Sequence, residues 1–270
     1  MKLDIGLVII GDEILSGKRV DRHFLKSQEI LSARGLVISW AHIIGDSPSA
    51  LTKFFKYSFS SNSVVFCFGG IGSTPDDFTR QSCSLALNLP LEENSIAVDL
   101  IKQRCNSLTL RVNEQRLNMA KFPSGSELIP NPVNGIPGFF IKSHYFLPGF
   151  PQMAWPMMEW VLDNRYHKHF SSTFEFDHFF KVKGLYESSV TPLLEKICES
   201  FPEFSVYSLP NSEATGRLKK EPSIELGLKC RLDLEKDERL DELFKLATKE
   251  FRLEILKLEG HIVEEGLLKR

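Results

Sequence analysis

The chain has 270 residues, with 33 Lys and Arg against 35 Asp and Glu, and 42% of its residues are hydrophobic. This composition is typical of a globular protein and excludes a disordered or fibrous chain. A formal charge of -2 provides no basic field for nucleic acid or anionic lipid, so neither is expected as a partner. No apolar run reaches the ~18 residues of a membrane span, and the first residues lack the apolar stretch of a signal peptide, so we expect a cytoplasmic protein.

Charged residues are distributed unevenly and divide the chain into two predicted domains. Residues 1–165 carry 16 Lys or Arg and 15 Asp or Glu, whereas the shorter stretch 166–270 carries 17 and 20. Because a smaller domain has more surface for its volume, it needs a larger share of charged residues. We therefore predict a larger domain over residues 1–168 and a smaller one over 169–270.

The first domain alternates short apolar runs with stretches of helical spacing. The apolar runs are typical of strands buried on both faces, as in a parallel sheet, and Gly or Pro marks the ends of the helical stretches. Strands are expected at 5–10, 36–44 and 64–68, and helices at 21–34, from 48 onward and at about 75–87. This alternation predicts an α/β domain with an open, mostly parallel sheet and right-handed crossovers.

Farther along the chain the predicted elements become shorter, and the second domain follows. Helices are expected at 92–104, 113–121 and 152–162, and short strands at 127–129, 139–141 and 145–147, among many Pro and Gly residues. Residues 224–232 alternate between apolar and polar, which predicts a strand with one buried face, and helical spacing covers 187–199 and 236–252. The second domain is therefore predicted to be a small α+β unit.

A glycine-rich turn follows the third predicted strand. Residues 69–77 read GGIGSTPDD, and they lie where a strand of an open α/β sheet leads into a helix, which is the usual place for ligands in such sheets. The three glycines permit positive φ and let a ligand come close to main-chain N–H groups. The turn is therefore a candidate binding site.

The same residues also fit an ordinary helix start. Thr74 suits the N-cap, Pro75 the first helical position and Asp77 the third, in a T-x-x-D version of the capping box. Capping explains one acid at a helix start. It does not explain the adjacent pair Asp76 and Asp77, because like charges this close repel unless a cation or a donor lies between them. We therefore favour a functional role for this turn.

A second turn, GDEILSG at residues 11–17, follows the first predicted strand. Paired carboxylates near the carboxyl edge of a sheet are suited to Mg²⁺, which prefers oxygen ligands and substrate phosphates. Asp12 and the later Asp21 can equally be a turn former and a helix cap. Asp46, at the end of the second predicted strand, can orient a reacting phosphate or begin the turn before Ser47. For these acids both interpretations remain open.

Together, GDEILSG and GGIGSTPDDFT resemble the MoaB/Mog molybdopterin-binding domain family. The similarity is closer to the CinA-like (competence/damage-inducible protein A) branch, which pairs that domain with a small α+β domain. It spans roughly residues 4–260. Further residues agree in order: Asn113, Asn118, Met119, Pro123, Gly125, Asn131, Gly135, Pro137, Gly138 and the run from Leu147 to Pro151.

This resemblance implies a three-layer α/β domain whose glycine turns line a pocket for a phosphate-bearing pterin or nucleotide. By position, Asp46 and Asp77 match acidic residues of the family's active site, and Glu13 and Asp76 are further candidates to bind metal or substrate. At position 23, where the branch usually has Asn, this chain has His23. The residues that the resemblance assigns to phosphate or ligand binding are Gly11, Gly69, Gly70, Gly72, Ser73 and Thr74.

Three functions are compatible with these residues. The first is a metal-dependent pyrophosphatase, using Mg²⁺, Co²⁺ or Mn²⁺, that acts on ADP-ribose or a related nucleotide; the metal would neutralise charge while main-chain N–H groups hold the phosphates. The second is a non-catalytic module that binds molybdopterin or a nucleotide, and the third is a molybdopterin adenylyltransferase. The second domain is expected either to mediate dimerisation or to cover a pocket, and the sequence leaves both open. The resemblance is compatible with a homo-oligomer.

Overall fold

The computed structural model describes residues 3–210, 222–233 and 237–269. The chain forms two compact units, the first from Met1 to Phe170 and the second from Ser171 to Arg270. Each unit has its own hydrophobic core. We describe the two units separately.

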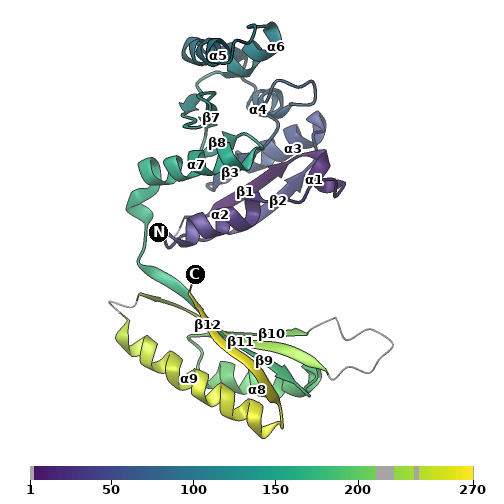
Figure 1. Cartoon of the computed structure of the whole chain (residues 1–270). Coiled ribbons are helices and arrows are strands. Elements are labelled where there is room, and N and C mark those ends of the chain that lie inside the picture. Colours follow the sequence, from purple (N-terminus) through teal and green to yellow (C-terminus); the bar gives the residue numbers. More distant parts are fainter. Residues whose placement is uncertain (1–2, 211–221, 234–236, 270) are drawn as a thin grey trace. The chain divides into compact units, whose positions relative to one another are not determined.

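A six-stranded sheet forms the centre of the first unit (Figure 1). In spatial order its strands are β2 (Trp40–Ile44), β1 (Ile5–Ile10), β3 (Val64–Phe68), β8 (His144–Leu147), β7 (Gly138–Ile141) and β6 (Glu127–Ile129). The first four are parallel, and β7 and β6 continue the sheet in antiparallel fashion. Every residue of β1 and β3 is buried, as their unbroken apolar sequences require. The predicted α/β fold with a mostly parallel sheet is confirmed.

Helices cover both faces of this sheet and complete three layers. One face packs against α2 (His23–Ser32) and α7 (Pro151–Val161), and the other against α3 (Pro48–Ser58) and α4 (Thr79–Leu87). The helix α5 (Ser95–Ser107) contributes to the core on this second side. Successive residues of β1 serve opposite layers, since Leu7 belongs to the first core and Val8 to the second. The carboxyl ends of the parallel strands remain uncovered by these helices.

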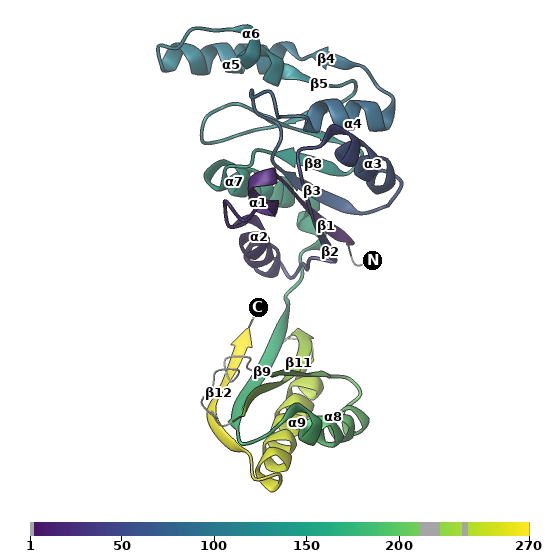
Figure 2. The same cartoon turned by 90° about the vertical axis from the view of Figure 1, so that its right-hand side faces the viewer.

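Shorter elements complete the first unit, and several depart from the predicted boundaries. They are α1 (Asp12–Leu15), β4 (Leu91–Glu93), β5 (Lys121–Pro123), α6 (Glu114–Leu117), and the turns of helix Asn118–Ala120, Leu162–Tyr166 and His167–His169. Figure 2 shows β4 and β5 beside α5. The helix expected at 92–104 begins later because Asn94 caps it, accepting a hydrogen bond from the Ala97 N–H at 3.1 Å. The second predicted strand is likewise shorter than 36–44.

The second unit is a four-stranded antiparallel sheet with two helices. Its elements in chain order are β9 (Thr173–Lys183), α8 (Glu187–Ser200), β10 (Ser205–Pro210), β11 (Ser223–Asp233), α9 (Glu238–Lys257) and β12 (His261–Lys269). The spatial strand order is β10-β11-β9-β12, which is the split β-α-β arrangement of ferredoxin-like domains. Alternate residues of β11, such as Leu226 and Leu228, are buried against the helices. The predicted small α+β unit is confirmed.

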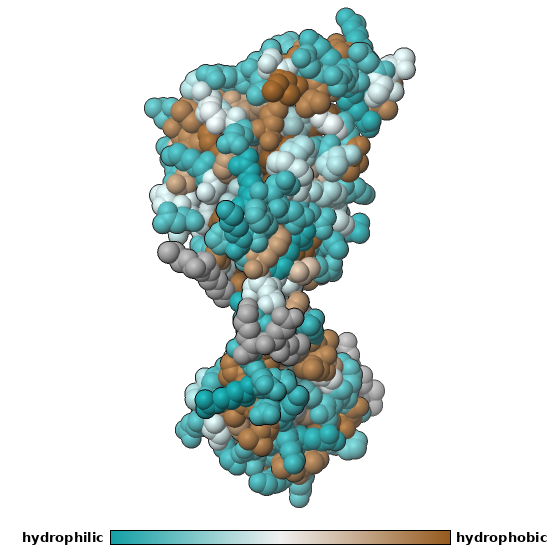
Figure 3. All heavy atoms as spheres, turned by 90° about the vertical axis from the view of Figure 1, so that its left-hand side faces the viewer, coloured by the Kyte–Doolittle hydropathy of each residue, from teal (hydrophilic) through white to brown (hydrophobic). Residues whose placement is uncertain are grey.

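Hydrophilic side chains cover most of the face of each unit that Figure 3 shows, with smaller hydrophobic patches among them. Scattered apolar side chains are normal on a surface in contact with water. Within the described ranges of the chain, no helix is long and apolar enough to cross a membrane.

Candidate functional site

The carboxyl ends of β1, β3 and β8 open onto a pocket of about 460 Å³. This volume is in the range of small-molecule sites. The pocket is lined by residues of the turn after β1, by Asp46 after β2, by the glycine-rich loop after β3, and by parts of the segments 131–137 and 148–153. All ten site residues proposed from the sequence line it: Gly11, Glu13, Asp46, Gly69, Gly70, Gly72, Ser73, Thr74, Asp76 and Asp77.

The floor of the pocket is main chain. Gly69 and Gly70 have φ values of 110° and 66°, in the region that favours glycine. A Cβ on Gly69 would lie 2.3 Å from the Ile10 carbonyl oxygen, and one on Gly149 would lie 3.4 Å from the Gly69 Cα. Thr79 fastens the loop from below, since its N–H donates to Gly70 O at 3.0 Å and its hydroxyl to Gly69 O at 3.1 Å. A side chain at Gly69 would therefore clash with the end of β1, whereas a Cβ at Gly149 would make only an ordinary contact.

The predicted cap at the start of the following helix is wrong. The helix α4 begins at Thr79 with Phe78 as its N-cap, and residues 74–77 form a turn of the loop. There the Asp77 carboxylate accepts hydrogen bonds from the Thr74 N–H at 2.8 Å and from the Thr74 hydroxyl at 2.5 Å. A Cβ on Gly72 would lie 2.7 Å from the same carboxylate oxygen. Asp77 therefore closes the loop through one oxygen, and its Oδ1 has no donor in the described part of the chain.

Four successive N–H groups of the loop are free for a ligand. Within the described ranges, the N–H groups of Gly70, Ile71, Gly72 and Ser73 have no acceptor, whereas that of Gly69 donates to Leu147 O at 3.0 Å. Consecutive N–H groups of this kind form a concave site that binds anions. The loop can therefore bind a phosphate through main-chain atoms.

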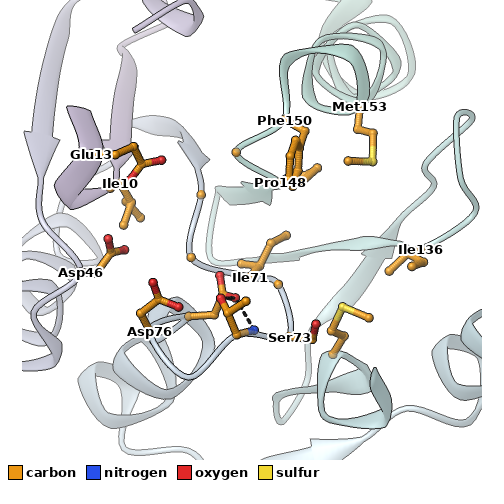
Figure 4. Close-up of a pocket in the computed structure, with 18 of the residues that line it drawn as sticks. Ile10, Glu13, Asp46, Ile71, Ser73, Asp76, Ile136, Pro148, Phe150 and Met153 are labelled. Carbon is orange, nitrogen blue, oxygen red and sulfur yellow. Dashed lines mark hydrogen bonds between the residues drawn. The ribbon is translucent and has the colours of Figure 1, made fainter. Parts of the chain in front are cut away.

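Three carboxylates lie along one side of the pocket, where Figure 4 shows Glu13, Asp46 and Asp76. Asp46 is fixed by a reciprocal pair of hydrogen bonds, in which the Asp12 N–H donates to Asp46 Oδ2 at 2.9 Å and the Asp46 N–H donates to Asp12 Oδ1 at 3.2 Å. Burial raises the pKa of Asp46 above its ordinary value, and repulsion from Asp12, Glu13 and Asp76 raises it further.

The other two candidate acids have structural roles. Asp12 forms the reciprocal pair with Asp46 and does not line the pocket. Asp21 caps α2, because its two carboxylate oxygens accept hydrogen bonds from the N–H groups of His23 and Phe24 at 2.9 and 3.0 Å. For these two residues the structural interpretation of the sequence holds.

The carboxylates suit a hard cation, but they form no complete cage. In residues 3–210, 222–233 and 237–269 there is no group of three or more His, Cys, Asp or Glu side chains arranged to hold a metal ion. Mg²⁺ commonly uses one or two carboxylates and completes its shell with water and substrate phosphates. The residues therefore fit a cation that is shared with the ligand. The repulsion that raises the pKa of Asp46 is what such a cation would relieve.

The opposite wall is apolar, and sequence reasoning did not identify it. Figure 4 shows Pro148, Phe150, Met153 and Ile136 on this side. The Phe150 side chain is 59% exposed although it lies only three residues after the end of the buried strand β8. The sequence signal available for this wall was the Pro-Gly-Phe turn at residues 148–150, which directly follows a predicted strand. Arg19, which also lines the pocket, has no comparable signal.

His23 supports this wall from behind. Its Nε2–H donates to the Gly149 carbonyl at 3.2 Å, and its ring stacks on Phe68 with centroids 4.5 Å apart. Burial lowers the pKa of His23, so the neutral ring with its proton on Nε2 matches this geometry. His23 therefore positions the Gly149 turn and does not enter the pocket.

Comparison with known proteins agrees with this architecture. Residues 6–168 match the family described as "Probable molybdopterin binding domain". A protein of Caldivirga maquilingensis is 28% identical over 196 residues, which are 71% of this chain and 75% of that protein. A CinA-like protein of a Sulfurihydrogenibium species is 30% identical over 205 residues, which are 74% of this chain and 50% of that protein. The chain thus matches about half the length of that CinA-like relative.

Among solved structures, the crystal structure of the protein CinA, of unknown function, from Thermoplasma acidophilum superimposes with a TM-score of 0.54. The two sequences are 24% identical, and the match covers 60% of this chain and 98% of the other. This likeness shows the fold. Because the family match covers more than half of the sequence, the chain belongs to the molybdopterin-binding domain family.

Proposed function

We propose that this chain is a metal-dependent pyrophosphatase of a nucleoside diphosphate-linked substrate, with ADP-ribose as the first to test. One observation supports this most: the pocket has carboxylates and free main-chain N–H groups on one side and an apolar wall on the other. A nucleotide has the same division, with phosphates at one end and a flat ring at the other. A nucleotide would therefore bind with its phosphates at the main-chain N–H groups and its ring at the apolar wall.

The main-chain side is suited to hold the phosphates. The free N–H groups between Gly70 and Ser73 would donate to phosphate oxygens, and they require no rearrangement because the loop is fastened to Thr79. A bound divalent cation, Mg²⁺, Mn²⁺ or Co²⁺, held by Glu13 and Asp76 together with the phosphates, would neutralise negative charge on the substrate. Without such neutralisation the acids would repel the ligand.

Asp46 is suited to act on water. Burial, the largest cause of its raised pKa, would remain when a cation offsets the repulsion from the other acids, and it makes Asp46 a stronger base than an ordinary aspartate. In hydrolysis, the water oxygen forms a bond to one phosphorus, the bond from that phosphorus to the bridging oxygen breaks, and Asp46 takes the water proton. ADP-ribose would yield AMP and ribose 5-phosphate. Asp77 would keep the phosphate loop closed and present its second oxygen to the reacting groups.

A metal-by-nucleotide panel tests this proposal. Purified protein is incubated with ADP-ribose, FAD and related dinucleotides in the presence of Mg²⁺, Mn²⁺ or Co²⁺, and released AMP is measured. We expect Asp46→Asn to lower turnover by about 10²-fold or more, as for a general base, and the exposed control Asp99→Asn on α5 to leave it unchanged. No release of AMP from any substrate would exclude hydrolysis, and activity unaffected by both Asp46→Asn and Asp77→Asn would exclude this site.

A non-catalytic role is the second candidate, and the family description favours it. A module that only binds a pterin or nucleotide would be stabilised by its ligand without turnover. Its affinity would also be the same after Asp77→Asn, provided that the loop stays closed. Molybdopterin adenylyl transfer is a third candidate, and ATP-dependent formation of an adenylylated pterin would identify it.

A further inference from the structure

A buried arginine lies directly beneath the phosphate loop. Arg80 is in the first turn of α4 and is 4% exposed. Its guanidinium donates one hydrogen bond to the Ile71 carbonyl and another, of 2.7 Å, to the Gly72 carbonyl. Burial lowers its pKa to about 10, and attraction to Asp77 opposes this change. The group therefore stays charged at neutral pH, and within the described residues no carboxylate forms an ion pair with it.

The two carbonyls determine where two N–H groups point. In a planar trans peptide, the N–H points away from the C=O of the same peptide. The Ile71 carbonyl shares its peptide with the Gly72 N–H, and the Gly72 carbonyl shares its peptide with the Ser73 N–H. Because both carbonyls face Arg80, both N–H groups face away from it. These are two of the free N–H groups of the loop, and both residues line the pocket.

We propose that Arg80 is a positioning residue that turns two successive peptides so that the N–H groups of Gly72 and Ser73 together bind one phosphate of the ligand. This inference rests on the proposed function only in taking a phosphate as the bound group. The planar fork of a guanidinium suits two neighbouring acceptors. Its buried positive charge also lies below the loop of a pocket whose charged lining residues are four acids and Arg19, so it favours an anion at the loop.

A purely structural role for Arg80 makes a different prediction. If the side chain only stabilised the fold, its replacement would lower the melting temperature without changing how the two N–H groups respond to an anion. Inorganic pyrophosphate is the probe, because its binding does not depend on hydrolysis of a nucleotide. The readout is the pair of backbone amide resonances of Gly72 and Ser73, followed by NMR in the full ¹⁵N-labelled chain.

In the wild-type protein, we expect pyrophosphate to shift both resonances downfield, as hydrogen bonding to an anion does. In Arg80→Gln we expect at least a tenfold weaker affinity and loss of both shifts. Cys83→Ala is the matched control, because Cys83 is fully buried in the same helix and, among the residues that the structure describes, makes no hydrogen bond to the loop. That variant should lose stability and keep the affinity of the wild type.

Arg80→Lys provides a second test in case the Gln variant does not fold. A buried lysine loses its proton more readily than an arginine. As the pH rises from about 7 to about 9, the affinity of this variant relative to wild type should therefore fall. The nearby Asp77 favours the charged lysine but should not prevent this loss. A constant ratio across this range would overturn the inference, and so would wild-type affinity and amide shifts in Arg80→Gln. If pyrophosphate shifts both amides but no nucleotide is hydrolysed, the proposed function fails and the role of Arg80 stands.

Discussion

Replacing Phe150 by alanine separates binding of the ligand's ring from binding of its phosphates. The ring is 59% exposed at the rim of the pocket, so its removal leaves no buried cavity and should change the free energy of unfolding by less than about 1 kcal/mol. Stacking of a flat heterocycle on an aromatic side chain contributes about 1 to 3 kcal/mol. We therefore expect the affinity for AMP or ADP-ribose to fall roughly 5- to 150-fold.

Titration calorimetry with AMP and with inorganic pyrophosphate provides the measurement. The affinity for AMP should fall in Phe150→Ala and be retained in Phe150→Tyr, whereas that for pyrophosphate should be the same in all three proteins. Tyr57→Ala is the matched control, since Tyr57 is 75% exposed on α3 and does not line the pocket. Equal losses for AMP and pyrophosphate, or no loss for AMP, would refute the assignment of the apolar wall to the ring.

Three further predictions follow from the site. Because the pKa of Asp46 is raised in the folded chain, its contribution to stability is present below its ordinary pKa of 3.8 and is lost as the pH rises through the folded value. Asp46→Asn should therefore raise the Tm at neutral pH, and this gain should disappear in acid. Thermal melts that show the reverse would contradict this. Gly69→Ala places a Cβ 2.3 Å from a carbonyl oxygen at a φ of 110° and should destabilise the chain by at least about 2 kcal/mol, whereas Gly125→Ala, with open space around its Cβ, should cost less in denaturant titration. EDTA should abolish release of AMP, because the proposed cation is shared with the substrate phosphates; activity in EDTA would exclude a metal.

The buried strands and the glycine-rich loop could be predicted because their signals are local. A run such as residues 64–68, apolar at every position, has few alternatives to a strand buried on both faces. The residues after such strands meet at one edge of a parallel sheet, which is why Asp46 and the loop lie in one pocket.

The start of α4 could not be predicted, because the local sequence signal fits two different structures. The T-P-D-D pattern predicts a helix cap, yet the same Thr74 and Asp77 form the same kind of hydrogen bond within a loop turn. The hydrogen bonds from Thr79 to the loop favour the loop turn over the helix cap. These bonds form only in the tertiary structure. The apolar wall was missed for the same reason, because Phe150 and Ile136 come from segments that meet the loop only in the folded chain.

The main-chain floor of the pocket has a consequence for how this site can change in evolution. In the proposed function, the floor at Gly69 would recognise a ligand through main-chain atoms, and a Cβ at this position would clash with the Ile10 carbonyl oxygen. The wall at Phe150 and Met153 consists of side chains at the rim. Mutations there can alter which ring is accepted while the phosphate site stays intact. A single scaffold can thus pass from one phosphorylated ligand to another by substitutions on one side of the pocket alone.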